Sequence, residues 1–403
     1  MRMKFNKSGQ LLLVSAASLL AAGLVTACST LTVDFVYVTS ALAAGSDSYG
    51  EIDVFEVNSE SGNMRQIPAS PFLAGGRNPV AEAVSTDMTN LYVVNRDDNS
   101  IVQFVVGNDG KLYPQNTVNT PGVFPVGVAV SGSTLYVVDT YQPLPTCSPA
   151  APCAGSIAVF PVNKDDSLGT PVVNTTNSTN YWPLTLPGSP NDVLAPTAIT
   201  VAASGAYVYV SAYDSTTDTG YVFGFTANSS GTLTPLNGGQ PFAAGRHPSA
   251  IASDPSGKYL YVTDYGRANI LGYQINSGML TALSGSPFTA GNQPAAVVVD
   301  GSGKYAYVAN SQDSNLFAYS IDSSSGALTR VGAYATGLQP VAIGIDPSKN
   351  QYLYTANFLG STVSGFQINA TDGTLLNSQY SPFRSNAQVT AVAAIPHGTP
   401  AKK

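Results

Sequence analysis

A few ionisable side chains stand among small apolar residues, and they are the ones in this 403-residue chain that could do acid–base chemistry. His247 directly precedes a proline and a short apolar segment, and an imidazole can accept a proton at neutral pH. Glu82 interrupts a similar apolar segment, where a carboxylate must be paired or neutralised. Arg246 and Arg77 each follow a glycine just before these two segments and could stabilise an oxyanion. The four residues are therefore candidate catalytic groups, with His247 or Glu82 as the base and the two arginines as anion-binding groups.

Each of these residues also has an alternative interpretation. Glutamine or asparagine occupies the place of His247 in related segments of the chain, so the imidazole could act only as a hydrogen-bonding group. Glu82 could form a buried ion pair with Arg77 or Arg246 instead of serving as a site carboxylate. The sequence alone leaves both alternatives open.

The segments that position these residues belong to a unit that occurs seven times. Each unit contains a strand signature such as Tyr-Val-Thr-Asp, and the seven copies begin at Tyr37, Tyr92, Tyr136, Tyr209, Tyr261, Tyr307 and Tyr354. A second strand ending in an aromatic residue follows, then a turn, often a Pro-Phe pair, and a proline that opens a small apolar strand. Four short strands per unit, repeated around an axis, predict an all-β, seven-bladed β-propeller with four-stranded antiparallel blades.

The two ends of the repeat array are complementary. The first unit lacks its opening strand, and one strand, residues 389–395, is left over after the seventh unit. We therefore expect residues 389–395 to pair with residues 33–39 and close the ring, because an open ring would expose sheet edges. An open solenoid of β repeats is the alternative arrangement.

Polar side chains recur at one end of each unit and are expected to gather at the mouth of the central channel. One set ends the Tyr-Val strand, and another precedes the inner strand; together they include Asn95, Asp139, Asp264, Asn78, Gln293 and Gln339. We predict that these six residues bind substrate, although Asn and Asp side chains could equally cap turns. Units 1, 3 and 4 carry longer loops on this face, which could form a rim.

The repeated Tyr-Val-x-Asn/Asp strands resemble those of Tyr-Val-Thr-Asn repeat propellers and of the seven-bladed lactonase family, which includes a 6-phosphogluconolactonase. This resemblance covers the chain from residue 28 almost to its end and implies hydrolysis of the ester of a small, sugar-type lactone. The repeated residues build blades, however, and no catalytic motif of the family can be placed on this sequence residue by residue. The alternative is a non-catalytic surface propeller that binds a protein or a glycan through its loop rim.

Composition excludes some partners. Charged residues make up only 10% of the chain, and 17 Lys and Arg against 24 Asp and Glu give a net charge of −7. A nucleic-acid-binding protein needs a basic surface, so we expect no nucleic acid as a partner. No phosphate-binding glycine loop or His-Glu-x-x-His motif occurs, so we expect no cofactor and no metal. We also expect a monomer.

The first residues are predicted to be an export signal. A basic start is followed by an apolar run, residues 11–24, that is too short to span a membrane comfortably. The run ends in Leu-Val-Thr-Ala-Cys, which resembles the lipobox of bacterial lipoproteins and implies acylation of Cys28. We therefore expect a signal peptide over 1–27, a propeller over 28–396 and a flexible tail over 397–403. The protein would be a membrane-anchored lipoprotein of a bacterial cell envelope; an ordinary signal peptide is the alternative.

The two remaining cysteines lie close together in the chain. Cys147 and Cys153 flank Ser-Pro-Ala-Ala-Pro in the long loop of the third unit. An exported protein can keep a disulfide, so we predict that this pair staples the loop, with two free thiols as the alternative.

Overall fold

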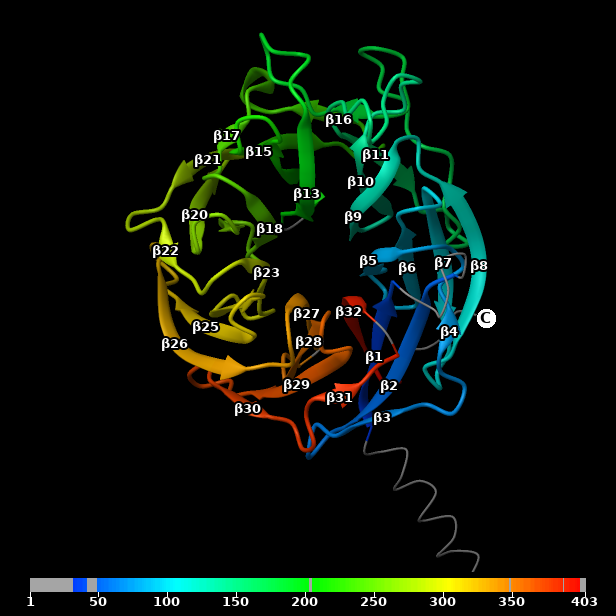
Figure 1. Cartoon of the computed structure of the whole chain (residues 1–403), viewed down its shortest axis with the longest axis vertical. Helices are drawn as coiled ribbons and strands as arrows, with labels where there is room; N and C mark the ends of the chain where they lie inside the picture. Colours follow the sequence, from blue (N-terminus) through cyan, green and yellow to red (C-terminus); the bar gives the residue numbers. More distant parts are fainter. Residues whose placement is uncertain (1–31, 42–48, 203–204, 348, 387, 399–403) are drawn as a thin grey trace, which may run out of the picture.

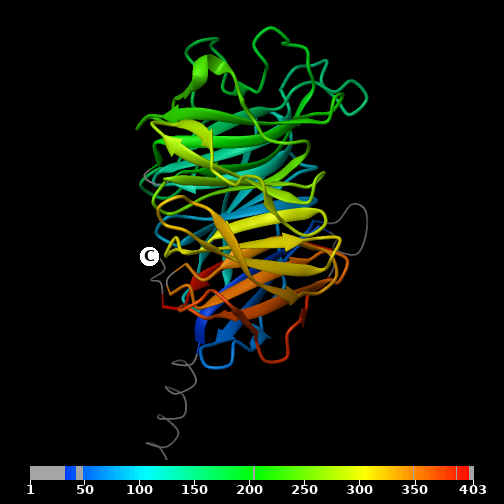
Figure 2. The same ribbon diagram turned by 90° about the vertical axis from the view of Figure 1, so that its left-hand side faces the viewer.

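Seven antiparallel sheets form a ring around a central axis (Figure 1). The computed structural model describes residues 32–41, 49–202, 205–347, 349–386 and 388–398. Seen from the side, the sheets are stacked one after another around the ring, with loops at both ends of their strands (Figure 2). The predicted all-β, seven-bladed propeller is confirmed.

In blades 1 to 4 the strands follow one another from the axis outward. Blade 1 contains β32 (Val389–Pro396), β1 (Thr32–Ser40), β2 (Glu51–Asn58) and β3 (Met64–Gln66), with β4 (Phe72–Leu73) beside β2. Blade 2 contains β5 (Pro79–Val84), β6 (Asn90–Asn95), β7 (Ser100–Val106) and β8 (Leu112–Asn119). Blade 3 contains β9 (Val123–Ser131), β10 (Thr134–Tyr141), β11 (Ser156–Pro161) and β12 (Trp182–Pro183). Blade 4 contains β13 (Leu194–Val201), β14 (Tyr207–Asp214), β15 (Thr219–Ala227) and β16 (Leu233–Pro235), with η2 (Asn237–Gly239) before β17 (Phe242–Ala243).

Blades 5 to 7 repeat the same order. Blade 5 contains β18 (Pro248–Ser253), β19 (Tyr259–Asp264), β20 (Asn269–Asn276) and β21 (Met279–Ala282), with β22 (Phe288–Thr289) beside β20. Blade 6 contains β23 (Pro294–Val299), β24 (Tyr305–Asn310), β25 (Asn315–Ile321) and β26 (Leu328–Ala335). Blade 7 contains β27 (Pro340–Ile345), β28 (Tyr352–Asn357), β29 (Thr362–Ile368) and β30 (Leu375–Asn377), with β31 (Phe383–Arg384) beside β29.

Proline opens the innermost strand of four blades. A proline lacks the N–H that a strand interior must donate, so the first position of a strand tolerates it. A β-bulge follows each of these prolines, which are Pro79, Pro248, Pro294 and Pro340. A bulge bends its strand locally. The bulged start of the inner strand therefore affects the direction in which the loop residues before it point.

The second strand of each blade holds neighbouring blades together. Its motif tyrosine is buried, and in four blades the tyrosine hydroxyl donates to a glycine carbonyl in the next blade; the pairs are Tyr37–Gly110, Tyr209–Gly278, Tyr261–Gly326 and Tyr307–Gly373. The apolar cores lie between the sheets, so each tyrosine adds a directional bond to a hydrophobic contact.

The C-terminal strand closes the ring as predicted. β32 pairs with β1 in antiparallel register, with Phe35 opposite Ile395, and forms the innermost strand of blade 1. Its backbone also approaches β27 closely, because a Cβ atom on Gly344 would lie 2.9 Å from the carbonyl oxygen of Val392. The packed chain continues to His397, whose backbone N–H donates to the Val33 carbonyl at 2.8 Å.

The cysteine predictions have different outcomes. Cys147 and Cys153 form the predicted disulfide, with an S–S distance of 2.03 Å and a Cα–Cα distance of 5.5 Å. Cys28 and the signal segment lie outside the described residues. Within the described ranges, no helix is long and apolar enough to cross a membrane.

Candidate functional site

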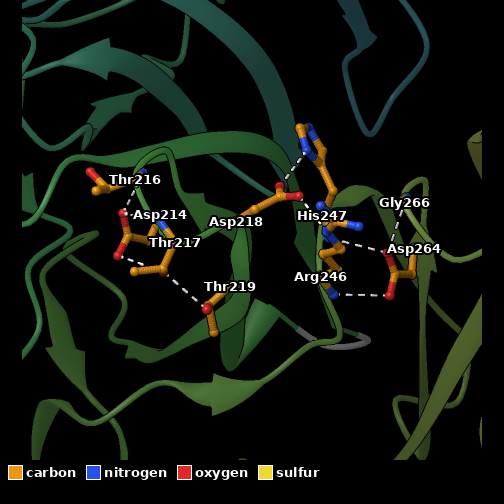
Figure 3. A network of polar contacts seen from close by, with 9 residues as sticks. All are labelled: Asp214, Thr216, Thr217, Asp218, Thr219, Arg246, His247, Asp264 and Gly266. Atoms are coloured by element: carbon orange, nitrogen blue, oxygen red, sulfur yellow. Dashed lines mark hydrogen bonds and ion pairs between the residues drawn. The ribbon is translucent and has the colours of Figure 1, made fainter.

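A carboxylate and an imidazole meet at the boundary between blades 4 and 5 (Figure 3). His247 Nδ1 lies 3.1 Å from Asp218 Oδ1, and Arg246 Nε lies 2.5 Å from Asp218 Oδ2. About one third of each of the His247 and Asp218 side chains is exposed to solvent, at 33% and 36%. The three side chains are therefore in contact with one another and remain accessible to solvent.

Asp218 comes from the tight turn between β14 and β15. It has φ 54, in the left-handed region that Asp and Asn enter more readily than other non-glycine residues. In the same turn, the Asp214 carboxylate accepts hydrogen bonds from the backbone N–H groups of Thr216 and Thr217, which hold the turn (Figure 3). The carboxylate of Asp218 is thus presented toward blade 5 by a turn that is itself fixed.

Arg246 and His247 belong to the loop that enters β18. The buried Asp264 carboxylate, at the end of β19, accepts the Arg246 N–H at 2.9 Å and the His247 N–H at 3.1 Å (Figure 3). The Tyr213 ring stacks on the imidazole, with ring centroids 3.8 Å apart. The backbone and one face of the ring are therefore held, and Nδ1 is directed at Asp218.

The electrostatic environment keeps Asp218 ionised. Desolvation alone would raise the pKa of Asp218, but hydrogen bonds from Arg246 and His247 outweigh it and lower that pKa. An ionised carboxylate can only accept hydrogen bonds, so Nδ1 must be the protonated nitrogen of a neutral His247. The other ring nitrogen, Nε2, is then a base that can take a proton from water.

The contact across blades has a cause in the repeat. In blade 2, Arg77 binds Asp98 of its own blade, with 2.6 Å between Nη2 and Oδ1. In blade 6, the Asn292 amide binds Asp313 in the same manner, at 2.9 Å. Blade 5 has Arg267 at the corresponding place, so Arg246 lacks this partner and reaches Asp218 in blade 4.

The sequence alone does not predict Asp218 as a site residue. This aspartate lies in a threonine-rich turn that carries no recognisable motif, and its partners come from the next blade. The replacement of an aspartate by Arg267 in the aligned repeats is the signal that could have revealed it. Comparison of corresponding turns therefore locates an altered ion pair that single residues do not show.

Glu82 and Arg77 do not join this site. Glu82 lies in the middle of β5, toward the neighbouring β32, and neither carboxyl oxygen has a hydrogen-bond partner of normal geometry. Desolvation raises the pKa of Glu82 well above its usual range, and the nearby Ala393 backbone offsets this only in part. The suggested ion pair between Glu82 and an arginine is wrong, because neither carboxyl oxygen of Glu82 has a hydrogen-bonding partner of normal geometry. Arg77 binds Asp98, and Arg246 binds Asp218.

The six predicted substrate-binding residues divide into two groups. The strand-end residues are fully buried and fasten loops: Asn95 donates to the Ala74 carbonyl, Asp139 accepts from Gly122 and Asp264 accepts from Arg246. The residues that precede the inner strands are half-buried and have φ between 52 and 56; they are Asn78, Gln293 and Gln339. Of the two groups, only this second one therefore remains partly exposed to solvent.

No metal centre accompanies these residues in the part of the chain that the structure describes. A group of three or more His, Cys, Asp or Glu side chains that could hold a metal ion does not occur there. Asp218 is the carboxylate of the site, and it contacts both His247 and Arg246.

Comparison with known proteins adds a family and a shared fold. The model of a family described as lactonase, seven-bladed β-propeller matches residues 35–143, 170–284 and 279–391. No curated protein matches the chain.

Solved structures share the fold at low sequence identity. A candidate 6-phosphogluconolactonase from Bacteroides fragilis is 19% identical, with a TM-score of 0.71, and the alignment covers 91% of this chain and 99% of that one. The periplasmic gluconolactonase of Pseudomonas aeruginosa is 18% identical, with a TM-score of 0.71 and coverage of 92% and 100%. Kuenenia stuttgartiensis hydrazine synthase is also similar, at 17% identity, a TM-score of 0.56 and coverage of 81% and 93%. Proteins of different activity thus share this fold, and function must be argued from the site.

Proposed function

The chain belongs to the seven-bladed β-propeller lactonase family, and from this premise we propose that it hydrolyses the ester bond of a small, unphosphorylated lactone at the boundary of blades 4 and 5. The observation that carries the proposal is the contact of Asp218 with both His247 and Arg246. It combines a base, a carboxylate that orients the base and a cation, within one accessible site.

The reaction follows from the orientation of the imidazole. His247 Nε2 removes a proton from a water molecule, whose oxygen forms a bond to the lactone carbonyl carbon. Asp218 holds the resulting imidazolium and stabilises its charge. The ring C–O bond then breaks, and the leaving alkoxide takes the proton from His247, so the product is a hydroxy acid.

Arg246 has a second role in this scheme. Its Nε is bound to Asp218, and more than half of its side chain is exposed, at 55%. The remaining guanidinium N–H groups can donate to the oxyanion that develops on the carbonyl oxygen. Arg77 and Glu82 take no part in this mechanism, because Arg77 is bound in blade 2 and Glu82 is enclosed beside β32.

We also propose that the protein acts outside the cytoplasm, attached through acyl chains on Cys28. The lipobox-like Leu-Val-Thr-Ala-Cys segment supports this, and one structural neighbour is described as periplasmic. A cytoplasmic sugar phosphate would not be available there, so the substrate lacks a phosphate. Mass spectrometry of the mature protein tests the anchor, because an N-terminus other than residue 28 contradicts it.

The hydrolysis proposal is tested on a panel of five- and six-membered sugar lactones, with acid release measured above the spontaneous rate. His247→Gln replaces the base with a residue that other blades accept at this place, and we expect a loss of about 10²-fold or more in kcat. Asp218→Asn should lower kcat with the fold intact. Asp98→Asn is the matched control, because it removes the corresponding ion pair of blade 2.

Two results would overturn the proposal. Absence of turnover over the whole panel would leave a surface protein that only binds its ligand. Turnover that is unchanged in His247→Gln would keep the enzyme but exclude this site.

A further inference from the structure

The contact between Tyr213 and His247 recurs elsewhere on the mouth face. Tyr213 lies near the end of β14 in blade 4 and directly follows Ala212, the counterpart of Asn95 in the repeat; His247 precedes the inner-strand proline of blade 5. In blades 2 and 3 the same two places hold Arg96 and Phe124, and the Arg96 guanidinium lies over the Phe124 ring at 5.1 Å. The repeat therefore places the residue after one strand end against the residue before the next inner strand.

Aromatic residues connect these two pairs. Tyr141, at the end of β10, contacts Phe124 with ring centroids 6.2 Å apart. β10 lies against β13, in which Ala195 is paired with Tyr213, so Tyr141 and Tyr213 lie on either side of the boundary between blades 3 and 4. Beyond His247, the Tyr265 ring follows at 5.9 Å. We call the series Arg96, Phe124, Tyr141, Tyr213, His247 and Tyr265 the aromatic arc.

The aromatic arc is accessible along its length. Each of its six residues is only partly buried, and together they pass from blade 2 to blade 5. The disulfide-closed loop begins directly after Tyr141, where the Gln142 N–H donates to the Ala154 carbonyl at 3.0 Å. This loop is fixed at its base and stands beside the middle of the arc.

Some arginines near the arc form an ion pair with an aspartate, and others do not. Arg96 forms no ion pair with any described residue, and its Nε is buried without an acceptor. Arg267, in the loop that carries Tyr265, is exposed and also forms no ion pair within the described ranges. By contrast, Arg77 and Arg246 on the same face are paired with aspartates. Cations without a counter-charge therefore lie near both ends of the arc.

We propose that the aromatic arc binds an acidic oligosaccharide, with sugar rings lying along the aromatic side chains and a carboxylate held by Arg96. Aromatic side chains offer flat apolar surfaces with polar edges, which suit the C–H face and the hydroxyl groups of a sugar ring. A guanidinium can bind a carboxylate through two parallel hydrogen bonds. The arc spans several blades, so its ligand is a chain of sugars, which extends the proposed function and does not require hydrolysis.

Calorimetry with a galacturonate tetramer tests this binding, because the tetramer carries carboxylates and contains no lactone. The tetramer should bind the intact protein at least tenfold more tightly than the galacturonate monomer or the neutral tetramer cellotetraose. Arg96→Gln should remove the preference for the acidic chain over the neutral one. Tyr141→Ala should remove the preference for the tetramer over the monomer.

Arg330→Gln is the matched control, because Arg330 lies over the Phe317 ring at 4.7 Å on the outer strand β26. It should leave both preferences unchanged. Equal affinity for monomer and tetramer, or an acidic preference that survives Arg96→Gln, would overturn the proposal. Since these ligands have no ester to hydrolyse, failure here leaves the lactone measurements with His247→Gln unaffected.

Discussion

The residue that precedes the inner strand has a different backbone conformation in different blades. Asn78, Gln293 and Gln339 occupy this place with φ of 52, 52 and 56, whereas His247 does not adopt a positive φ. A change in φ alters the direction in which the side chain leaves the backbone. The imidazole therefore does not simply replace an amide, and it meets Tyr213 and Asp218 of the preceding blade.

The buried carboxyl group of Asp139 provides a test of electrostatics. Burial raises the pKa of Asp139 to about 7, and hydrogen bonds from Thr120 and Gly122 offset this only partly. Between pH 4 and pH 7 the unfolded chain releases this proton and the folded protein does not. Asp139 therefore stabilises the fold least above pH 7, and the free energy of unfolding falls as the pH rises through this range.

Asp139→Asn should remove this dependence, since Asn95 and Asn310 fill the same place in other blades. Relative to the native protein, the variant should become more stable as the pH rises from 4 to 8, by a total on the order of a few kcal/mol. Urea unfolding at a series of pH values measures the difference, and Asp165→Asn on the surface serves as the control. A difference that does not vary with pH would contradict the raised pKa.

Glu82 allows an opposite kind of prediction. Its carboxyl oxygens are enclosed without a hydrogen-bond partner of normal geometry, and valine occupies the corresponding place in blades 3 and 6. Glu82→Val should raise the free energy of unfolding by about 1–3 kcal/mol, because a polar group without hydrogen bonds leaves the interior. Lactone hydrolysis should persist. A stable variant that has lost hydrolysis would instead make Glu82 a catalytic residue.

The sequence alone predicts only some of the residues that form the site. His247 and Glu82 can be selected because each breaks a repeated pattern. The partner of His247 cannot, because Asp218 lies in another blade and its approach depends on how two sheets pack. The position of Glu82 beside β32 likewise depends on ring closure, which joins residues far apart in the chain.

At the scale of the strand, the repeated tyrosine has a role that its position alone does not show. The sequence predicts a buried strand. The hydrogen bond from the tyrosine hydroxyl forms only because a turn of the next blade places its glycine carbonyl within reach. Tyr261 donates to the Gly326 carbonyl at 2.8 Å, and the two residues belong to different blades. The second strand thus bonds to the next blade in addition to packing in the apolar core.

Tyr261→Phe isolates the hydroxyl bond between blades 5 and 6. The phenylalanine ring keeps the apolar contact, while the Gly326 carbonyl loses its donor, so the free energy of unfolding should fall by about 1–3 kcal/mol. Tyr113→Phe, at a tyrosine that is 47% exposed, provides the control and should change little. Equal stability of the two variants in urea would show that the bond between blades contributes nothing.

For the whole molecule, the arrangement of the chain ends decides whether the ring is continuous. The repeat count and the leftover strand predict closure, and β32 forms the inner strand of blade 1 beside β1. The seam has its own chemistry: Tyr354 donates its hydroxyl to Asp34 at 3.2 Å, where four other blades use a glycine carbonyl. Sequence periodicity does not reveal this exchange, because it arises only where the first and last segments meet.

Removal of residues 388–403 tests how far the fold depends on that seam. The truncated chain would lose β32, expose the inner edge of β1 and separate β27 from β5, so cooperative unfolding should give way to a broad transition and aggregation. A chain ending at residue 398 keeps β32 and the His397–Val33 hydrogen bond, and should melt like the native protein. A peptide of residues 388–398 added to the truncated chain should restore a sharp transition, since it supplies the missing strand. If the truncated chain alone melts cooperatively at the native temperature, the six complete blades are sufficient and the closing strand is not what holds the ring together.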